Sequence, residues 1–262
     1  MVELHYERLG AGPRLLYCNG SGVTLASTWP MLAHLAAGFD LVAFDYRGLG
    51  ASTPVTDSYA MADLAADVAG LLDALGWEDT AMIGLSFGGM VAQEFAVTYP
   101  RRVTRLALLA TSPGGAFASY PLETLAGLPD AERAERILTL TDRRWTPEWL
   151  AAHPDQAALA SGATPDGTAG TPGAVLQLQA RSGHDVLDRL SRVSCPTFVG
   201  SGRFDGIAPM ANGEAIAERI AGAQFRVYQG GHGFLAQDRA AWPDLLAFLG
   251  SDGEGAADKL GR

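Results

Sequence analysis

Residues 80–89 read TAMIGLSFGG and are the most informative stretch of the sequence. Residues 80–83 have the composition of a short buried strand, and a helical pattern begins near Gly89. Between them, residues 84–88 match the pattern G-x-S-x-G. The pattern alone is weak evidence, but a strand before it and a helix after it are the setting of a sharp turn that exposes a serine hydroxyl. We therefore predict that Ser86 is a nucleophile.

Short β-rich runs alternate with helical patterns on both sides of this motif. Such alternation is typical of a mostly parallel sheet with helices on both faces. Residues 106–109 are continuously apolar, as expected for a strand that is buried on both faces. Helical spacing is present at residues 61–75 and 90–99. The predicted strands cover residues 14–17, 41–44, 80–83, 103–109, 197–199 and 225–228.

The alternation stops between residues 113 and 194, where helical fragments surround a passage rich in Gly, Thr and Pro. We predict one α/β core, made of residues 1–112 and 195–250, with residues 113–194 inserted as a helical cap over one end of the sheet. Residues 251–262, SDGEGAADKLGR, have the composition of a disordered tail. The helical fragments of the insertion cover residues 122–140, 147–153 and 175–190.

A serine hydroxyl needs a base to take its proton, and the base must be oriented by a third group. His232 follows the predicted strand at 225–228, on a loop at the same sheet edge as Ser86. Asp205 follows the strand at 197–199 and precedes His232, which gives the chain order Ser, acid, His. The loop at residues 110–115 is an alternative place for the acid, but it contains no carboxylate.

Acyl transfer also needs two backbone N–H groups that bind the oxyanion of the tetrahedral intermediate. Phe87, which follows the nucleophile, is predicted to supply one. We assign the other to Ser21, in the sequence Asn19-Gly20-Ser21-Gly22 after the first predicted strand. An ordinary glycine-rich turn is the competing interpretation of that loop.

Composition and charge exclude several classes of function. The formal net charge is -10, and the sequence contains no run of Lys or Arg of the kind that neutralises the phosphates of a nucleic acid, so nucleic acid is not an expected partner. The charged N-terminus does not resemble a signal peptide, and no apolar stretch is long enough for a membrane span, so we expect a cytoplasmic protein. The five histidines are scattered and the common metal motifs are missing, so we predict no metal site and no cofactor.

Together these residues resemble the α/β-hydrolase superfamily, and within it the 3-oxoadipate enol-lactonase-like proteins and small microbial serine esterases. The resemblance covers roughly residues 4–249. Residues 19–20 are Asn-Gly where the family commonly has His-Gly, so the hydrogen bonding near the oxyanion loop must differ. The stretches that carry the resemblance are GLSFGGMVAQEFA (84–96), DYRGLGAS (45–52), CPTFVGSGRFDGIAP (195–209), GGHGFLAQD (230–238) and, more loosely, WTPEWLAAHP (145–154).

The resemblance and the motifs together predict a serine hydrolase that cleaves a small ester or lactone through an acyl-enzyme. A C–C bond hydrolase, a perhydrolase or a lyase on the same fold stays open as an alternative, because the fold hosts many chemistries. A receptor that binds a ligand without turnover is a further alternative. The sequence does not decide the oligomeric state.

Four apolar residues within the insertion are candidates for the lining of a substrate pocket. The competing interpretation is that they only pack the interior of the cap. They are Phe117, Leu138, Trp145 and Trp149.

Overall fold

The computed structural model describes residues 2–125, 127–162 and 170–250. Within these residues, seven strands form one sheet in the order β1-β3-β2-β4-β5-β6-β7. β1 runs antiparallel to β3 and all other neighbours are parallel. The strands are β1 (Tyr6–Leu9), β2 (Arg14–Cys18), β3 (Asp40–Phe44), β4 (Thr80–Leu85), β5 (Val103–Leu109), β6 (Thr197–Gly202) and β7 (Gln224–Tyr228).

All six predicted strands are present, with ends that differ by at most three residues. The seventh strand, β1, was not predicted. It lies at the edge of the sheet and most of its residues are exposed, so it lacks the apolar run by which the inner strands are recognised. The predicted α/β architecture is thus confirmed, with one antiparallel edge strand added.

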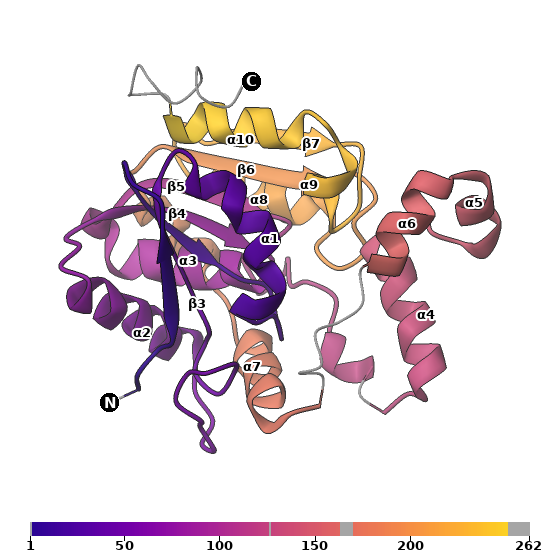
Figure 1. Cartoon of the computed structure of the whole chain (residues 1–262), viewed down its shortest axis with the longest axis horizontal. Helices are drawn as coiled ribbons and strands as arrows, with labels where there is room; N and C mark the ends of the chain where they lie inside the picture. Colours follow the sequence, from indigo (N-terminus) through magenta and orange to yellow (C-terminus); the bar gives the residue numbers. More distant parts are fainter. Residues whose placement is uncertain (1, 126, 163–169, 251–262) are drawn as a thin grey trace.

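Helices cover both faces of the sheet. Leu16 and Cys18 of β2 pack in one apolar cluster with α2 (Met61–Ala74) and α3 (Phe87–Thr98). The alternate residues, Leu15 and Tyr17, pack in a second cluster with α1 (Leu25–Ala36) and α10 (Ala241–Gly250). Figure 1 shows α10 and α2 on opposite sides of the sheet. α8 (Met210–Arg219) and α9 (Phe234–Gln237) complete the core.

The segment between β5 and β6 is helical, as predicted, but it contains shorter elements. They are η2 (Leu122–Leu125), α4 (Asp130–Thr141), α5 (Pro147–Ala152), α6 (Pro154–Gly162), α7 (Pro172–Ser182) and η3 (Leu187–Arg192). The fragment predicted at 122–140 is divided because Pro129 stands at the N-cap of α4. The fragment predicted at 175–190 is divided at Gly183, the C-cap of α7.

The parts of this segment occupy different places. Figure 1 shows α4, α5 and α6 grouped beside one end of the sheet, with α7 apart from them. Leu190 of η3 packs in the same apolar cluster as α2 and α3. The C-terminal end of the predicted insertion therefore packs against the core. The role of residues 113–194 as a cap remains a prediction. The predicted tail at 251–262 lies outside the described residues. None of the helices within the described ranges is long and apolar enough to span a membrane.

Candidate active site

Ser86 occupies a strained turn between β4 and α3. Its φ of 55° and ψ of -117° lie in a region of backbone conformation that residues other than glycine rarely adopt. Two hydrogen bonds hold the turn: the Ser86 N–H donates to the Leu109 carbonyl at 2.8 Å, and the Thr111 hydroxyl donates to the Ser86 carbonyl at 2.6 Å. The strained conformation is maintained because Leu109, the last residue of β5, and Thr111, just after the strand, hold the N–H and the carbonyl of Ser86.

The glycines of the G-x-S-x-G pattern allow this turn to pack closely. A Cβ atom at Gly88 would collide with the carbonyl oxygen of Cys18, at the end of β2. A Cβ atom at Gly84 would meet the backbone of Gly88. Any side chain at these two positions would thus push α3 away from the sheet, and Ser86 would move with it.

The structure brings Ser86, His232 and Asp205 into one hydrogen-bonded chain. The distance from His232 Nε2 to Ser86 Oγ is 2.9 Å, and His232 Nδ1 lies 2.7 Å from Asp205 Oδ2. The side chains come from loops after β4, β7 and β6, whose carboxyl ends meet at one edge of the sheet. Because a carboxylate accepts only, Nδ1 carries the proton in this arrangement and Nε2 is free to accept from the serine hydroxyl.

Asp205 is held rigidly and shielded from water. The residue is 0% exposed. Its Oδ1 atom accepts hydrogen bonds from the N–H groups of Ile207 and Ala208, at 2.7 and 2.8 Å, so only Oδ2 faces the histidine. Two backbone donors and the imidazole together compensate the buried charge.

The C-terminal end of α4 contacts both of these loops. The His232 N–H donates to the Thr141 carbonyl at 2.6 Å, and the Gly206 N–H, next to Asp205, donates to the Leu140 carbonyl at 2.9 Å. The last carbonyls of a helix have no partner within the helix. Here the loops that carry the acid and the base supply those partners.

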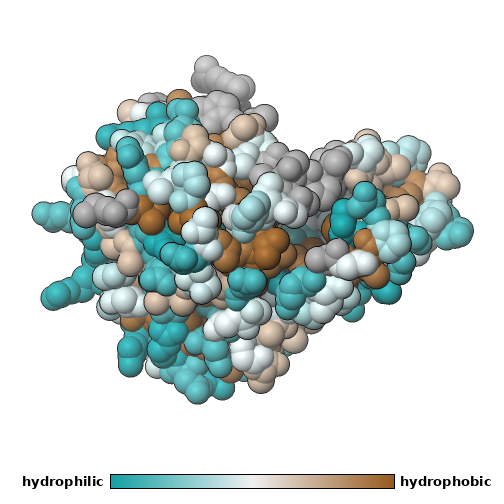
Figure 2. Space-filling view, turned by 90° about the horizontal axis from the view of Figure 1, so that it is seen from below, coloured by the Kyte–Doolittle hydropathy of each residue, from teal (hydrophilic) through white to brown (hydrophobic). Residues whose placement is uncertain are grey.

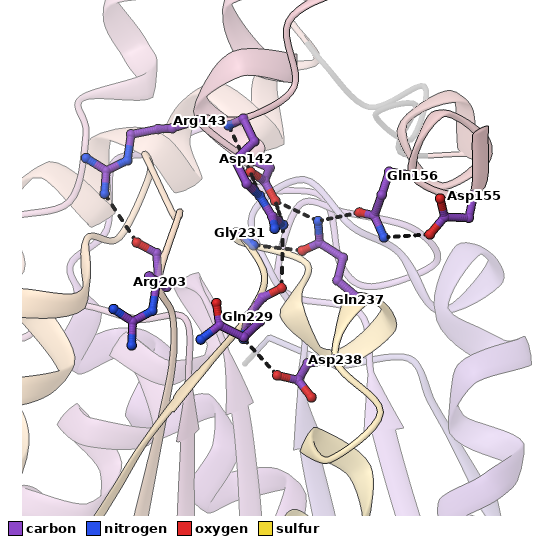
Figure 3. A network of polar contacts seen from close by, with 10 residues as sticks. Asp142, Arg143, Asp155, Gln156, Arg203, Gln229, Gly231, Gln237 and Asp238 are labelled. Atoms are coloured by element: carbon purple, nitrogen blue, oxygen red, sulfur yellow. Dashed lines mark hydrogen bonds and ion pairs between the residues drawn. The ribbon is translucent and has the colours of Figure 1, made fainter. Parts of the chain in front are cut away.

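A polar network strengthens the same contact (Figure 3). The side-chain carbonyl of Gln237 accepts from the Gly231 N–H at 2.7 Å, and its amide donates to Asp142 at 2.8 Å and to Gln156 of α6 at 3.3 Å. Asp142 is fully buried and also binds the guanidinium of Arg144. Sequence reasoning missed these residues, because nothing in the local sequence shows that Asp142 and Gln237 pair across 95 positions.

The predicted oxyanion donors lie beside Ser86. A Cβ atom built on Gly20 would lie 3.8 Å from Ser86 Cβ, so the loop that contains Ser21 passes next to the nucleophile. Phe87 is the first residue of α3, where backbone N–H groups have no partner within the helix. Among the described residues, neither the Phe87 N–H nor the Ser21 N–H has a hydrogen-bond acceptor. Both groups are therefore available to a ligand.

The four residues predicted to line a pocket differ in burial and surroundings. Trp145 is buried, and its indole N–H has no acceptor among the described residues. Trp149 stacks on His153, with ring centroids 3.9 Å apart. Leu138 and Phe117 are half-buried. Their role in binding remains a prediction.

The surface is indented between the core and the lobe of α4 to α6. Figure 2, which views the molecule from below, shows a hollow between the body around the sheet and the projecting lobe of α4 to α6, and hydrophobic residues gather near the middle of this face.

Across the described ranges, no three His, Cys, Asp or Glu side chains form a group that could hold a metal ion.

A separate cavity of about 290 Å³ lies between the end of β5 and α7. Ser112, Arg181 and His184 are among the residues that line it, and none of Ser86, Asp205 and His232 does. Burial lowers the pKa of His184 to about 4. This histidine lines a cavity that does not include Ser86, and the imidazole in contact with the serine hydroxyl is that of His232, so His184 does not compete for the role of base.

Comparisons with known proteins agree with the fold. Residues 13–238 match the family described as alpha/beta hydrolase fold. The chain is 30% identical to a poly(3-hydroxyalkanoate) depolymerase of Ectopseudomonas oleovorans, over 90% of this chain and 83% of the relative. It is also 30% identical to a 2-hydroxymuconate semialdehyde hydrolase of Pseudomonas sp. (strain CF600), over 98% and 92%.

A solved structure is similar over nearly the whole length. The enol-lactonase from Burkholderia xenovorans LB400 has a TM-score of 0.78 and 24% identity, and the match covers 95% of this chain and 96% of that one. At this identity the likeness concerns the fold alone. The sheet order, the elbow at Ser86 and the family match over residues 13–238 lead to one assignment: the chain belongs to the α/β-hydrolase family.

Proposed function

We propose that this protein is a serine hydrolase that cleaves a carboxylic ester or lactone through an acyl-enzyme on Ser86. The observation that carries the proposal is the unbroken chain from Ser86 Oγ to His232 to the buried Asp205. A pocket alone could belong to a receptor. A serine in a strained turn, with a base and an orienting acid in hydrogen-bond contact, has a use only if the hydroxyl is deprotonated.

In the first step, His232 Nε2 takes the proton of Ser86 as Oγ attacks the substrate carbonyl carbon. The carbonyl oxygen becomes an oxyanion, which the N–H groups of Phe87 and Ser21 stabilise. The imidazolium formed at His232 is stabilised by Asp205, which keeps its charge throughout. His232 then protonates the alcohol oxygen as it leaves, and the acyl group remains on Ser86.

In the second step, water replaces the alcohol. His232 accepts a proton from the water as its oxygen attacks the acyl carbon, and a second oxyanion occupies the same two donors. Collapse of this intermediate breaks the bond to Ser86 Oγ, which regains its proton from His232. The products are the free acid, the alcohol and the unchanged enzyme, with no cofactor needed.

The names of two relatives indicate candidate substrate classes. The name of the Ectopseudomonas relative describes an enzyme that acts on a polyester, which favours an ester, and we propose a small-molecule ester or lactone as the partner of the site. The inserted helices would act as a cap over it, with Trp145 and Leu138 on the apolar side. The Pseudomonas relative's name instead favours C–C bond cleavage as a second candidate, on a semialdehyde.

A substrate panel tests the proposal. Purified protein and its Ser86→Ala variant are assayed with p-nitrophenyl esters from acetate to decanoate, with a small lactone and with 2-hydroxymuconate semialdehyde. Ester or lactone turnover that is lost in the variant is the expected result, and the chain-length profile then measures the acyl pocket. Turnover of the semialdehyde alone would replace the first candidate by the second, and ester turnover that survives Ser86→Ala would refute both the nucleophile and the proposal.

A further inference from the structure

Gln177 of α7 joins the inserted segment to the loop beside the nucleophile. Its side-chain carbonyl accepts a hydrogen bond of 2.6 Å from the backbone N–H of Gly22, 155 positions earlier in the chain. The side chain is 0% exposed. A short hydrogen bond from a half-buried loop N–H to a fully buried side chain is a strong positional constraint.

The loop that receives this constraint has little stiffness of its own. It contains Gly20, Ser21 and Gly22, and Gly22 has a φ of +67°, in the region where glycine is favoured. Glycine is the most conformationally free residue. Gln177 binds the peptide unit that joins Ser21 to Gly22. This hydrogen bond therefore fixes the position of Ser21 through the peptide that follows it.

α7 is well placed to act as the fixed partner, because it is held near both ends. At its N-terminal end, Gly173 packs so closely on the Gly48 turn that a Cβ atom would collide with the Gly48 carbonyl. At its C-terminal end, the buried guanidinium of Arg181 donates to the Ser119 hydroxyl and to the Tyr120 carbonyl, both at 2.7 Å. Figure 1 shows α7 next to the core and apart from the lobe of α4 to α6.

The second polar atom of Gln177 indicates that stability alone does not explain this residue. Because the Gly22 N–H needs an acceptor, the side-chain oxygen faces Gly22 and the NH₂ group faces elsewhere, where it is buried without a partner among the described residues. A buried unpaired donor is costly. A methionine would fill a similar volume and remove the unpaired NH₂ group, but it would also remove this acceptor of the Gly22 N–H. The two effects on stability oppose each other, so what glutamine adds at this position is the fixed place of the loop.

We infer that Gln177 is a positioning residue of the reaction, which sets the oxyanion loop so that the Ser21 N–H points at the developing oxyanion. A helix of the inserted segment then takes part in transition-state stabilisation, in addition to any part it has in covering the pocket. This inference rests on the proposed function, since it presupposes an oxyanion formed by attack of Ser86.

The test replaces Gln177 by methionine and compares it with Gln179→Met, an exposed position on the same helix. Each protein is titrated with a p-nitrophenyl phosphonate, so that rates are expressed per competent active site and misfolded molecules do not count. kcat and KM are measured with the best ester of the panel. Affinity is measured for a boronic acid, whose tetrahedral adduct places an oxygen in the oxyanion site, and for the planar product acid.

For Gln177→Met, we expect kcat per site to fall about 10- to 100-fold, because one oxyanion donor is misplaced rather than deleted. The boronic acid should lose affinity by a similar factor, while KM, the affinity for the product acid and the thermal midpoint change little. Gln179→Met should match the parent protein. A purely structural role would instead lower the thermal midpoint and leave kcat per site unchanged.

Two outcomes separate the two proposals. If parent turnover depends on Ser86 but kcat per site in Gln177→Met stays within twofold of the parent, the inference about Gln177 is overturned and the serine hydrolase remains. If parent turnover is independent of Ser86, the proposed function itself fails, and the inference fails with it.

Discussion

Asp205→Asn should nearly abolish turnover while leaving the fold intact, and the hydrogen bonds of Asp205 explain why. Oδ1 accepts from two backbone N–H groups, Ile207 and Ala208. The oxygen of an asparagine must therefore take the place of Oδ1, and its NH₂ group must face His232 Nδ1. Two donors cannot bond to each other, so Nδ1 loses its proton and the proton resides on Nε2, the atom that faces Ser86.

A histidine with its proton on Nε2 cannot accept the proton of Ser86. The loss of kcat expected from the wrong tautomer is about 10⁴-fold, which corresponds to about 5.5 kcal/mol of barrier height. The assay is ester hydrolysis per titrated active site. Asp238→Asn is the matched control, because that carboxylate also caps loop N–H groups, at Gln229 and Ala240, without touching the histidine. A folded Asp205→Asn protein within tenfold of the parent rate would refute the assigned role.

Three further predictions concern the surroundings of the site. Gln237→Leu should leave the Gly231 N–H and Asp142 without this partner. We therefore expect a lower thermal midpoint together with a lower kcat. A lower midpoint with an unchanged kcat would show that this network stabilises the fold without supporting catalysis. Burial lowers the pKa of His184 from 6.5 to about 4. Between these two pH values the unfolded chain therefore binds more protons than the folded protein. The free energy of unfolding should fall by at most about 3 kcal/mol as the pH drops from 6.5 to 4. Denaturant unfolding of a His184→Leu protein should show a smaller drop, and an unchanged pH dependence would contradict the assignment. Gly88→Ala should give little folded, active protein because its new methyl group meets backbone; a normal thermal midpoint by circular dichroism would show that α3 can move away.

The inner part of the fold could be predicted because each buried strand has its own local signature. Continuous apolar runs such as residues 106–109 indicate burial on both faces, wherever the strand lies in the sheet. β1 lacks that signature, because Glu7 and Arg8 are exposed at the sheet edge. α1 was missed for a different reason: Pro30 lies within it and interrupts the helical pattern in sequence.

The proposed catalytic residues could be named from the sequence because each directly follows a predicted strand. Parallel strands bring their carboxyl ends to one edge, so Ser86, Asp205 and His232 could be expected to meet without any knowledge of their distances. The supporting contacts were not predictable in this way. Gln177 and Gln237 look like ordinary helical glutamines in the sequence, and their partners become visible only when the inserted helices are packed on the core.

The most direct test of the account is to trap the acyl group on the protein. The protein is mixed with a p-nitrophenyl ester, quenched with acid within milliseconds to seconds, and examined by intact mass spectrometry and peptide mapping. The account predicts a mass increase equal to the acyl group, located on the peptide that contains Ser86 and missing from Ser86→Ala. Rapid hydrolysis without any adduct at Ser86, or with equal rate in Ser86→Ala, would contradict the acyl-enzyme mechanism.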